Sequence, residues 1–274
     1  MADQEQAVLK KLRVEPGEKI RLRDRNPRDK SLFGDEQETK AATAALAKDI
    51  DTLQDRLYAE GARALLVILQ GTDTSGKDGT IRSVFNATGP LGVSVHAFGP
   101  PSRLELEHDY LWRVHAAAPR RGTIGIFNRS HYEDVLIGKV HKLAPEKVVE
   151  QRYDQINAFE KMLAENGTTI LKFMLHISKD EQKERLQERL DDPAKHWKFN
   201  PGDLEDREHW DEYQDAYEIM LNRCSTKWAP WHIIPADRKW VRNAAIATIV
   251  KATLEEMDPQ YPEVSWKPGD FKIE

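Results

Sequence analysis

The stretch that decides the fold of this chain is Ala64-Leu65-Leu66-Val67-Ile68-Leu69 followed, after Gln70, by Gly71-Thr72-Asp73-Thr74-Ser75-Gly76-Lys77. A buried strand that runs into a glycine-rich turn and then a helix is typical of a phosphate-binding loop, because glycines let backbone N–H groups curl around an anion. The lysine then reaches the terminal phosphates, and the following helix directs its positive end towards them. The stretch therefore predicts phosphate binding; the alternative is an incidental strand–helix turn.

Two acidic residues distinguish this loop from the usual pattern. Asp78 follows the lysine, where a Ser or Thr hydroxyl normally contacts Mg²⁺. Asp73, inside the loop, would repel a phosphate unless a metal ion or a cation lies beside it. We infer that Asp73 faces Mg²⁺ or the acceptor phosphate; alternatively it faces solvent and stabilises the turn. The residues expected to bind phosphate or nucleotide here are Gly71, Thr74, Ser75, Gly76, Asp78, Gly79 and Thr80.

Composition limits the class of protein. At 274 residues, 39% hydrophobic and 32% charged, the chain can form one large α/β domain or two small ones. A single cysteine, Cys224, excludes an intramolecular disulfide and favours a reducing compartment. No run approaches membrane-spanning length, and a net charge of −5 argues against a general nucleic-acid binder. We therefore expect a cytoplasmic protein with neither a membrane nor a nucleic-acid partner.

The first 35 residues form a locally basic arm. Residues 10–30 hold nine Lys or Arg against four acidic residues. Such an arm on an acidic protein is able to contact a polyanion. The alternative is a solvated extended arm that packs on a neighbour or is disordered.

The rest of the chain alternates strands with helices. Strands are predicted at 64–69, 92–98, 123–128, 169–176 and 231–235, and helices at 36–60, 103–117, 145–165, 180–190, 204–222 and 239–257. This alternation predicts an α/β fold with a five-stranded parallel sheet covered by helices on both faces. Ligands then bind at the carboxyl ends of the strands. We expect a domain over 36–258 that includes a helical lid at about 180–222, and a tail at 259–274.

Polar side chains follow the predicted third strand. That strand ends at Asn128, in a position where Asp usually organises the metal beside a phosphate loop. A neutral amide binds Mg²⁺ weakly, so Asp73 or phosphate oxygens must balance more of the metal's charge. Asp73 and Asn128 are therefore the candidate metal ligands. Arg129 is placed to clamp a phosphate or to form a structural salt bridge, and Glu133 contacts the acceptor or caps a turn.

Cations gather in the predicted lid. Charge runs usually mark a solvated helix face, but residues 189–198 place three cations and Trp197 around a helix break, where side chains are able to point inward. Such a tract suits a polyanion longer than one nucleotide. The candidate polyanion contacts are Arg185, Arg189, Lys195 and Lys198.

Four segments taken in order resemble family-2 polyphosphate kinases: residues 70–80, 127–135, 189–198 and 231–240. The resemblance spans about residues 35–258. It implies a P-loop kinase fold with a helical lid, the transfer of phosphate between inorganic polyphosphate and adenine nucleotides, and Mg²⁺, with Mn²⁺ as an alternative ion. Asn128 and Glu133 match the pattern of class III, which accepts both AMP and ADP. Family members commonly self-associate, so a homo-oligomer is expected, with the helix at 36–60 as a candidate interface.

The resemblance also implies roles for particular residues. Lys77 would hold the transferred phosphate, Asp73 would orient the attacking phosphate, and Glu133 would bias nucleotide choice. Arg129 and Arg189 would stabilise the charge of the transition state, which makes Asp73, Lys77, Arg129 and Arg189 the expected catalytic set. The expected polyphosphate path adds Arg82, Lys195 and Lys198.

Two other functions stay open on the sequence. An ordinary nucleoside monophosphate kinase would use ATP as its donor and ignore polyphosphate. A non-catalytic nucleotide sensor would bind a partner through the basic arm and turn nothing over. The donor requirement separates the first of these from a polyphosphate kinase, and deletion of residues 1–30 tests the second.

Overall fold

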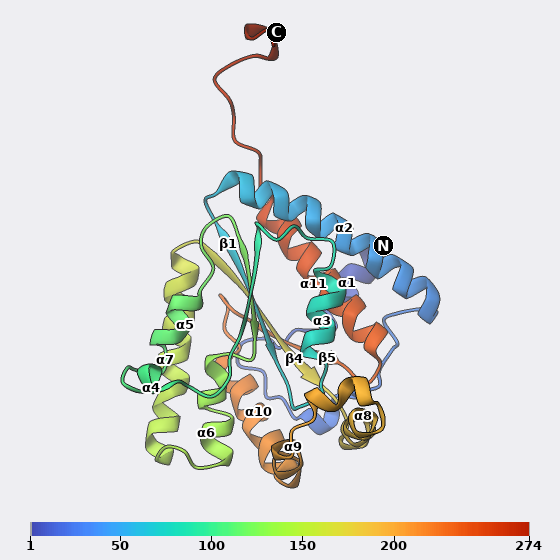
Figure 1. Ribbon diagram of the computed structural model, residues 1–274, viewed down its shortest axis with the longest axis vertical. Helices are drawn as coiled ribbons and strands as arrows, with labels where there is room; N and C mark the ends of the chain where they lie inside the picture. Colours follow the sequence, from blue (N-terminus) through green and yellow to red (C-terminus); the bar gives the residue numbers. More distant parts are fainter. Residues whose placement is uncertain (1, 274) are drawn as a thin grey trace.

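A computed structural model describes residues 2–273 of the chain, and a five-stranded sheet lies at its centre (Figure 1). The strand order is β2-β3-β1-β4-β5, and every neighbouring pair is parallel. The predicted five-stranded parallel sheet is confirmed. Its strands are β1 (Ala64–Gln70), β2 (Val93–Ala97), β3 (Ile124–Asn128), β4 (Thr168–His176) and β5 (Trp231–Pro235).

Helices cover both faces of this sheet. Successive side chains of a strand point to opposite faces, and in β1 Leu65, Val67 and Leu69 enter one apolar cluster while Leu66 and Ile68 enter the other. The first cluster packs against α1 (Ala2–Leu12), α2 (Glu36–Glu60), α3 (Lys77–Val84) and α11 (Lys239–Met257). The second packs against α7 (Glu146–Glu165) and α10 (Trp210–Cys224).

Local capping explains several helix boundaries. Asp35 accepts hydrogen bonds from the backbone N–H groups of Gln37 and Glu38 and starts α2, while Gly61, at φ +64°, ends it. The prediction of one helix over 103–117 was wrong: α4 (Arg103–Leu106) and α5 (Trp112–Ala117) are separated by a turn. In that turn the Asp109 carboxylate accepts from the N–H of Leu111 at 3.0 Å, which competes with helical hydrogen bonding.

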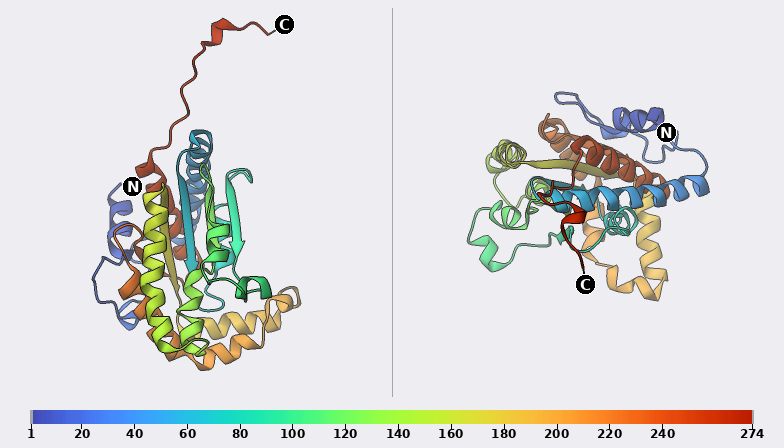
Figure 2. Two further views of the ribbon diagram at one scale, coloured as in Figure 1. Left: turned by 90° about the vertical axis from the view of Figure 1, so that its left-hand side faces the viewer. Right: turned by 90° about the horizontal axis from the view of Figure 1, so that it is seen from above.

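The predicted helical excursion leaves the body of the domain after β4 and returns at α10 (Figure 2). It contains α8 (Lys179–Asp191), η3 (Pro193–Lys198) and α9 (Gly202–Glu208), and we call these three elements the lid. The single helix expected over 204–222 is in fact two, α9 and α10, separated at His209. The second half of α10 belongs to the core, where Ala216, Met220 and Leu221 are buried.

The N-terminal arm packs on its own domain (Figure 2). Val8, Val14 and Leu22 are almost fully buried, and the N–H of Val14 donates to the carbonyl of Trp231 at 2.8 Å. Four of its cations pair with acidic residues, through the contacts Lys11–Asp29, Arg13–Glu15, Arg25–Glu18 and Arg28–Asp237.

At the C-terminal end of the chain, residues 259–273 extend away from the body of the domain (Figure 1). Within residues 2–273, no helix has the length and apolar character needed to cross a membrane.

The remaining short elements connect these layers. They are η1 (Leu22–Asp24), η2 (His131–Asp134), α6 (Ile137–Val140) and η4 (Pro268–Asp270). Of these, η2 matters for the site, because it follows β3 at the carboxyl end of the sheet.

Candidate active site

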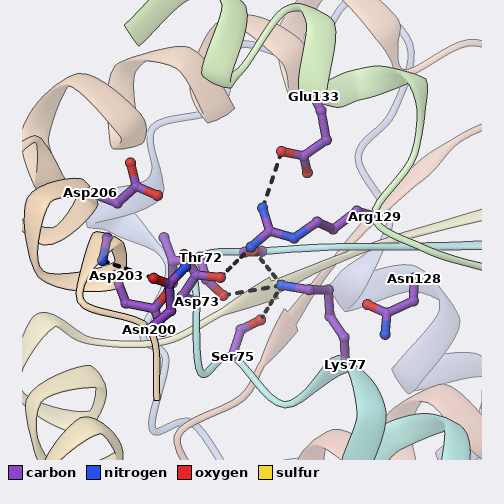
Figure 3. A network of polar contacts seen from close by, with 12 residues as sticks. Thr72, Asp73, Ser75, Lys77, Asn128, Arg129, Glu133, Asn200, Asp203 and Asp206 are labelled. Atoms are coloured by element: carbon purple, nitrogen blue, oxygen red, sulfur yellow. Dashed lines mark hydrogen bonds and ion pairs between the residues drawn. The ribbon is translucent and has the colours of Figure 1, made fainter. Parts of the chain in front are cut away.

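The glycine-rich turn between β1 and α3, residues 71–77, is the phosphate loop. Gly76 precedes the first turn of α3 with φ +101°, a left-handed conformation that L side chains rarely adopt. Lys77 folds back across the loop, and its ammonium donates to the carbonyls of Gly71 at 2.8 Å and Thr72 at 3.3 Å and to Ser75 Oγ at 3.5 Å (Figure 3). The lysine therefore rests in the mouth of a preformed cradle.

The surroundings of Lys77 change its acidity. Burial, and next the positive charge of Arg129, lower the pKa of its ammonium to about 8, although the carboxylates of Asp73, Glu133 and Asp78 act in the opposite direction. The lysine is charged at neutral pH but loses its proton far more easily than an exposed lysine does.

A pH dependence follows from this pKa. Because the protonated lysine is the form that attracts phosphates, kcat/KM should be constant near neutrality and fall as the pH rises through about 8. Bound phosphates stabilise the charged form, so the fall in kcat should come at higher pH than the fall in kcat/KM. Initial rates between pH 6.5 and 10 measure both profiles, and a kcat/KM that stays flat to pH 10 would contradict this expectation.

Arg129 follows β3 and lies between two carboxylates. Its guanidinium pairs with Asp73 and donates to Glu133 at 3.2 Å (Figure 3). Burial would lower the pKa of Arg129, but the charges of Glu133 and Asp73 outweigh it and raise that pKa. The backbone of Arg129 has φ +63°, a conformation that is uncommon outside glycine and concentrates at functional sites.

The carboxylate and amide expected to bind metal each have a protein partner. Asn128 Nδ2 donates to the Asp78 carboxylate at 2.7 Å, which ties the end of β3 to the first turn of α3. Asp73 is the partner of Arg129, so its charge is balanced by the cation that it required. The acidic residue beside Asn128 is therefore Asp78. Asp73, Asp78 and Asn128 all line one cleft between the phosphate loop and the lid.

This cleft has a volume of about 360 Å³ and runs between the phosphate loop and the lid. Half of the residues that line it are cations, and the others are acidic, amide-bearing or small. Its lining is Asp73, Thr74, Gly76, Lys77, Asp78, Gly79, Asn128, Arg129, Arg185, Glu188, Arg189, Lys195, Lys198 and Lys239. Lys239 was missed by sequence reasoning, although its neighbours Asp237 and Arg238 follow β5 at the same edge of the sheet.

The cations of the lid differ in their exposure and in the number of their protein partners. Arg189 donates to the Asp203 carboxylate and to the Lys198 carbonyl, both at 2.9 Å. Lys195 pairs with Asp192 at 3.1 Å and is about half exposed. Arg185 lines the cleft but is mostly buried, and its N–H groups donate to the Glu181 carboxylate and to the carbonyls of Thr74, Ser75, Ala236 and Asp237.

Three predicted residues do not line the cleft. The Thr80 side chain is fully buried on α3, Arg82 is exposed on the same helix, and neither lines the cleft. Ser75 is buried and its hydroxyl faces Lys77. The loop glycines and Lys77 thus provide the anion-facing surface.

A smaller hollow lies beside Arg129 and Glu133. Its walls include Trp210, Tyr213 and Tyr217 of α10 and Asp206 of α9, none of which sequence reasoning singled out. Burial, and next the charge of Asp73, raise the pKa of the nearby Asp203 to about 6.

A parallel sheet in this order, a phosphate loop after its central strand, an arginine at the end of β3 and a cationic lid together define a P-loop phosphotransferase. The family model described as "Polyphosphate kinase 2 (PPK2)" matches residues 34–262. The chain belongs to the polyphosphate kinase 2 family.

Individual proteins agree with this assignment. The chain is 53% identical over 256 residues to the AMP/ADP-polyphosphate phosphotransferase of Meiothermus ruber, covering 93% of this chain and 96% of that protein. It is 40% identical to the ADP-polyphosphate phosphotransferase of Rhodopseudomonas palustris, covering 93% of each chain. The crystal structure of polyphosphate kinase 2 from Arthrobacter aurescens TC1 superposes with a TM-score of 0.92 at 42% identity, covering 96% of this chain and 94% of that one.

Proposed function

We propose that this protein transfers the terminal phosphoryl group of inorganic polyphosphate to AMP and to ADP, giving ADP and ATP, and that it also catalyses the reverse reaction. The observation that carries the proposal is the wide cleft beside the phosphate loop, in which Lys77, Arg129, Arg189, Lys195 and Lys198 face one space. Five cations around one cleft suit a polyanion. The name of the Meiothermus ruber relative supports both acceptors.

The geometry suggests how each residue acts. An oxygen of the nucleotide's terminal phosphate attacks the end phosphorus of polyphosphate, the P–O bond to the rest of the chain breaks, and a chain shorter by one phosphate leaves with the electron pair. Lys77 exchanges its loop carbonyls for phosphate oxygens, and Arg129 and Arg189 offset the charge that develops. Because the attacking oxygen is already anionic, orientation and electrostatics carry the rate without a strong general base.

The site also fits a divalent cation. Asp73, Asp78 and Asn128 supply oxygen atoms to the same cleft, whereas no cluster of three His, Cys, Asp or Glu able to hold a metal occurs in residues 2–273. Mg²⁺ commonly takes one or two carboxylates and completes its shell with water and substrate phosphates. We propose that Asp73 and Asn128, with Asp78 beside them, hold Mg²⁺, with Mn²⁺ as a substitute. When bound, the ion would neutralise phosphate charge.

Glu133 is the residue through which we expect nucleotide choice to act. Its side chain lines the small hollow, and its carboxylate accepts a hydrogen bond from Arg129 at 3.2 Å. In the variant Glu133→Asn, the ratio of kcat/KM for AMP to that for ADP should change at least about fivefold, more than the summed activity does. Initial rates with each nucleotide at fixed polyphosphate measure the ratio, and an unchanged ratio would make Glu133 a structural partner of Arg129.

The decisive experiment on function uses the donor. The purified protein is incubated with AMP, long-chain polyphosphate and Mg²⁺ without ATP, and nucleotides are followed by chromatography. ADP should appear first and ATP second. Absence of product, with activity on AMP restored by ATP as donor, would instead identify an ordinary nucleoside monophosphate kinase. Nucleotide binding without turnover under either condition would identify a sensor.

We further propose a setting for this activity. The single cysteine, Cys224, is free and fully buried, which fits a reducing cytoplasm. The buried residues of α2 recur every three or four positions, and the exposed face between them is the candidate interface of a homo-oligomer. Partners beyond polyphosphate and adenine nucleotides, such as a membrane or nucleic acid, have no part in the proposal.

A further inference from the structure

Arg242 lies directly behind the phosphate loop. It belongs to the first turn of α11, is only 3% exposed, and does not line the cleft. Its Nη1 donates to the carbonyl of Ser75 at 3.3 Å, and its Nε and Nη2 donate to Asn243 Oδ1 at 3.1 and 2.9 Å. The side chain therefore connects α11 to the turn that cradles phosphate.

The contact between Arg242 and the loop is close. A Cβ atom added to Gly76 would lie 1.7 Å from Arg242 Nη1, and one added to Gly79 would lie 3.1 Å from Nη2. The guanidinium thus occupies the space that these two glycines leave open. It contacts the turn at the point where the loop becomes helix α3.

The charge of Arg242 has no acidic partner. Among residues 2–273, no carboxylate lies within 4.0 Å of its guanidinium. Its charged neighbour is Arg185, which also donates to the Ser75 carbonyl, at 3.2 Å, but is paired with Glu181 at 2.8 Å. Burial, and next the charge of Arg185, lower the pKa of Arg242 to about 10, so it stays charged at neutral pH.

An uncompensated buried charge destabilises a folded protein. The anion that is positioned to compensate Arg242 is the phosphate on the other side of the loop. We propose that Arg242 is a positioning residue for phosphoryl transfer: it holds the Ser75 carbonyl so that the loop N–H groups face the cleft, and its charge is balanced when polyphosphate phosphates occupy the cradle. This inference rests on the proposed function.

The variant Arg242→Met separates this role from a purely structural one. Met fills similar space without charge, and Arg185 still donates to the Ser75 carbonyl. The melting temperature of the free protein should stay the same or rise, the increase in melting temperature caused by sodium tripolyphosphate should fall by more than half, and KM for polyphosphate should rise about tenfold. The effect on kcat should be smaller than that on KM.

Two further variants make the test specific. Arg242→Lys keeps the charge and should restore most of the tripolyphosphate-induced shift. Arg121→Met removes an exposed charge before β3, at the opposite edge of the sheet, and should change neither quantity.

Two outcomes would overturn the role of Arg242. One is an Arg242→Met protein that is destabilised or unfolded, because Arg242 would then be a structural support. The other is a variant with unchanged KM and an unchanged shift. Failure of the proposed function looks different, because the unmodified protein would then show no tripolyphosphate shift and no turnover of polyphosphate.

Discussion

Replacing Lys77 with alanine should remove nearly all turnover while leaving the protein folded. The ammonium of Lys77 rests on loop carbonyls at the mouth of the cradle, where it meets the transferred phosphate. Loss of one preorganised donor to a charged transition state typically costs 10²- to 10³-fold in kcat, and a full positive charge in a buried site should reach about 10³-fold or more. Initial rates with AMP and polyphosphate measure the loss.

The control for Lys77→Ala is Lys48→Ala, which removes an exposed ammonium from α2. It should retain the activity of the unmodified protein. Both variants should show the same circular dichroism spectrum as the unmodified protein, because Lys77 contacts two loop residues, Gly71 and Thr72, that line the small hollow and do not belong to the apolar core. Normal turnover by Lys77→Ala would rule out the phosphate loop as the reaction centre.

The largest effect on stability is expected at a buried ion pair under the site. Lys172 of β4 and Glu160 of α7 lie 2.6 Å apart with both side chains fully buried. The same ammonium donates to Tyr132 Oη and to the Cys224 carbonyl, each at 2.7 Å, and Glu160 accepts from Tyr132 Oη at 2.8 Å. Burial raises the pKa of Glu160, but Lys172 and His131 together outweigh burial and hold that pKa below its ordinary value.

The variant Glu160→Leu leaves the Lys172 charge buried without its partner, which should lower the free energy of unfolding by about 3–5 kcal/mol. The double variant Glu160→Leu/Lys172→Met removes both charges and should recover most of that loss. Urea unfolding followed by circular dichroism gives all values of the cycle, with Lys172→Met as the fourth member. A loss below about 1 kcal/mol in Glu160→Leu, or a double variant no more stable than either single one, would contradict this account.

The buried Lys172–Glu160 pair also contacts a segment of the active site. Tyr132 and His131, both in contact with Glu160, lie in η2 between Arg129 and Glu133. The pair therefore anchors the segment that carries two site residues. A partly folded Glu160→Leu variant should lose activity together with stability.

The sheet and the phosphate loop could be predicted from the sequence because the patterns that indicate them lie within short segments of the chain. Each strand is an apolar run bounded by turn residues, and β1 leads directly into the loop glycines. The helix at 103–117 was wrong because an Asx turn at Asp109 competes with an otherwise helical stretch. The apolar spacing of such a stretch does not reveal that competition.

The pairing of site residues was harder to predict because it depends on distant segments. The sequence placed Asp73 and Asn128 at one edge, but their partners are Arg129 and Asp78, each more than 45 residues away along the chain. Arg185 lines the cleft as expected, but the sequence did not reveal that its guanidinium also donates to four backbone carbonyls. No spacing rule distinguishes a lid cation that points to solvent from one that points inward.

The packed N-terminal arm limits where this chain can be joined to a relative in a chimeric protein. The family model begins at residue 34, whereas the arm covers β5 and α10 through Val14 and Ile20 and reaches Asp237 beside the lid through Arg28. Asp237 in turn accepts from the N–H and hydroxyl of Ser178, the residue that starts α8. In a chimera with a relative, the arm should therefore come from the same parent as β5 and the base of the lid, because a junction at residue 34 would separate surfaces that contact each other.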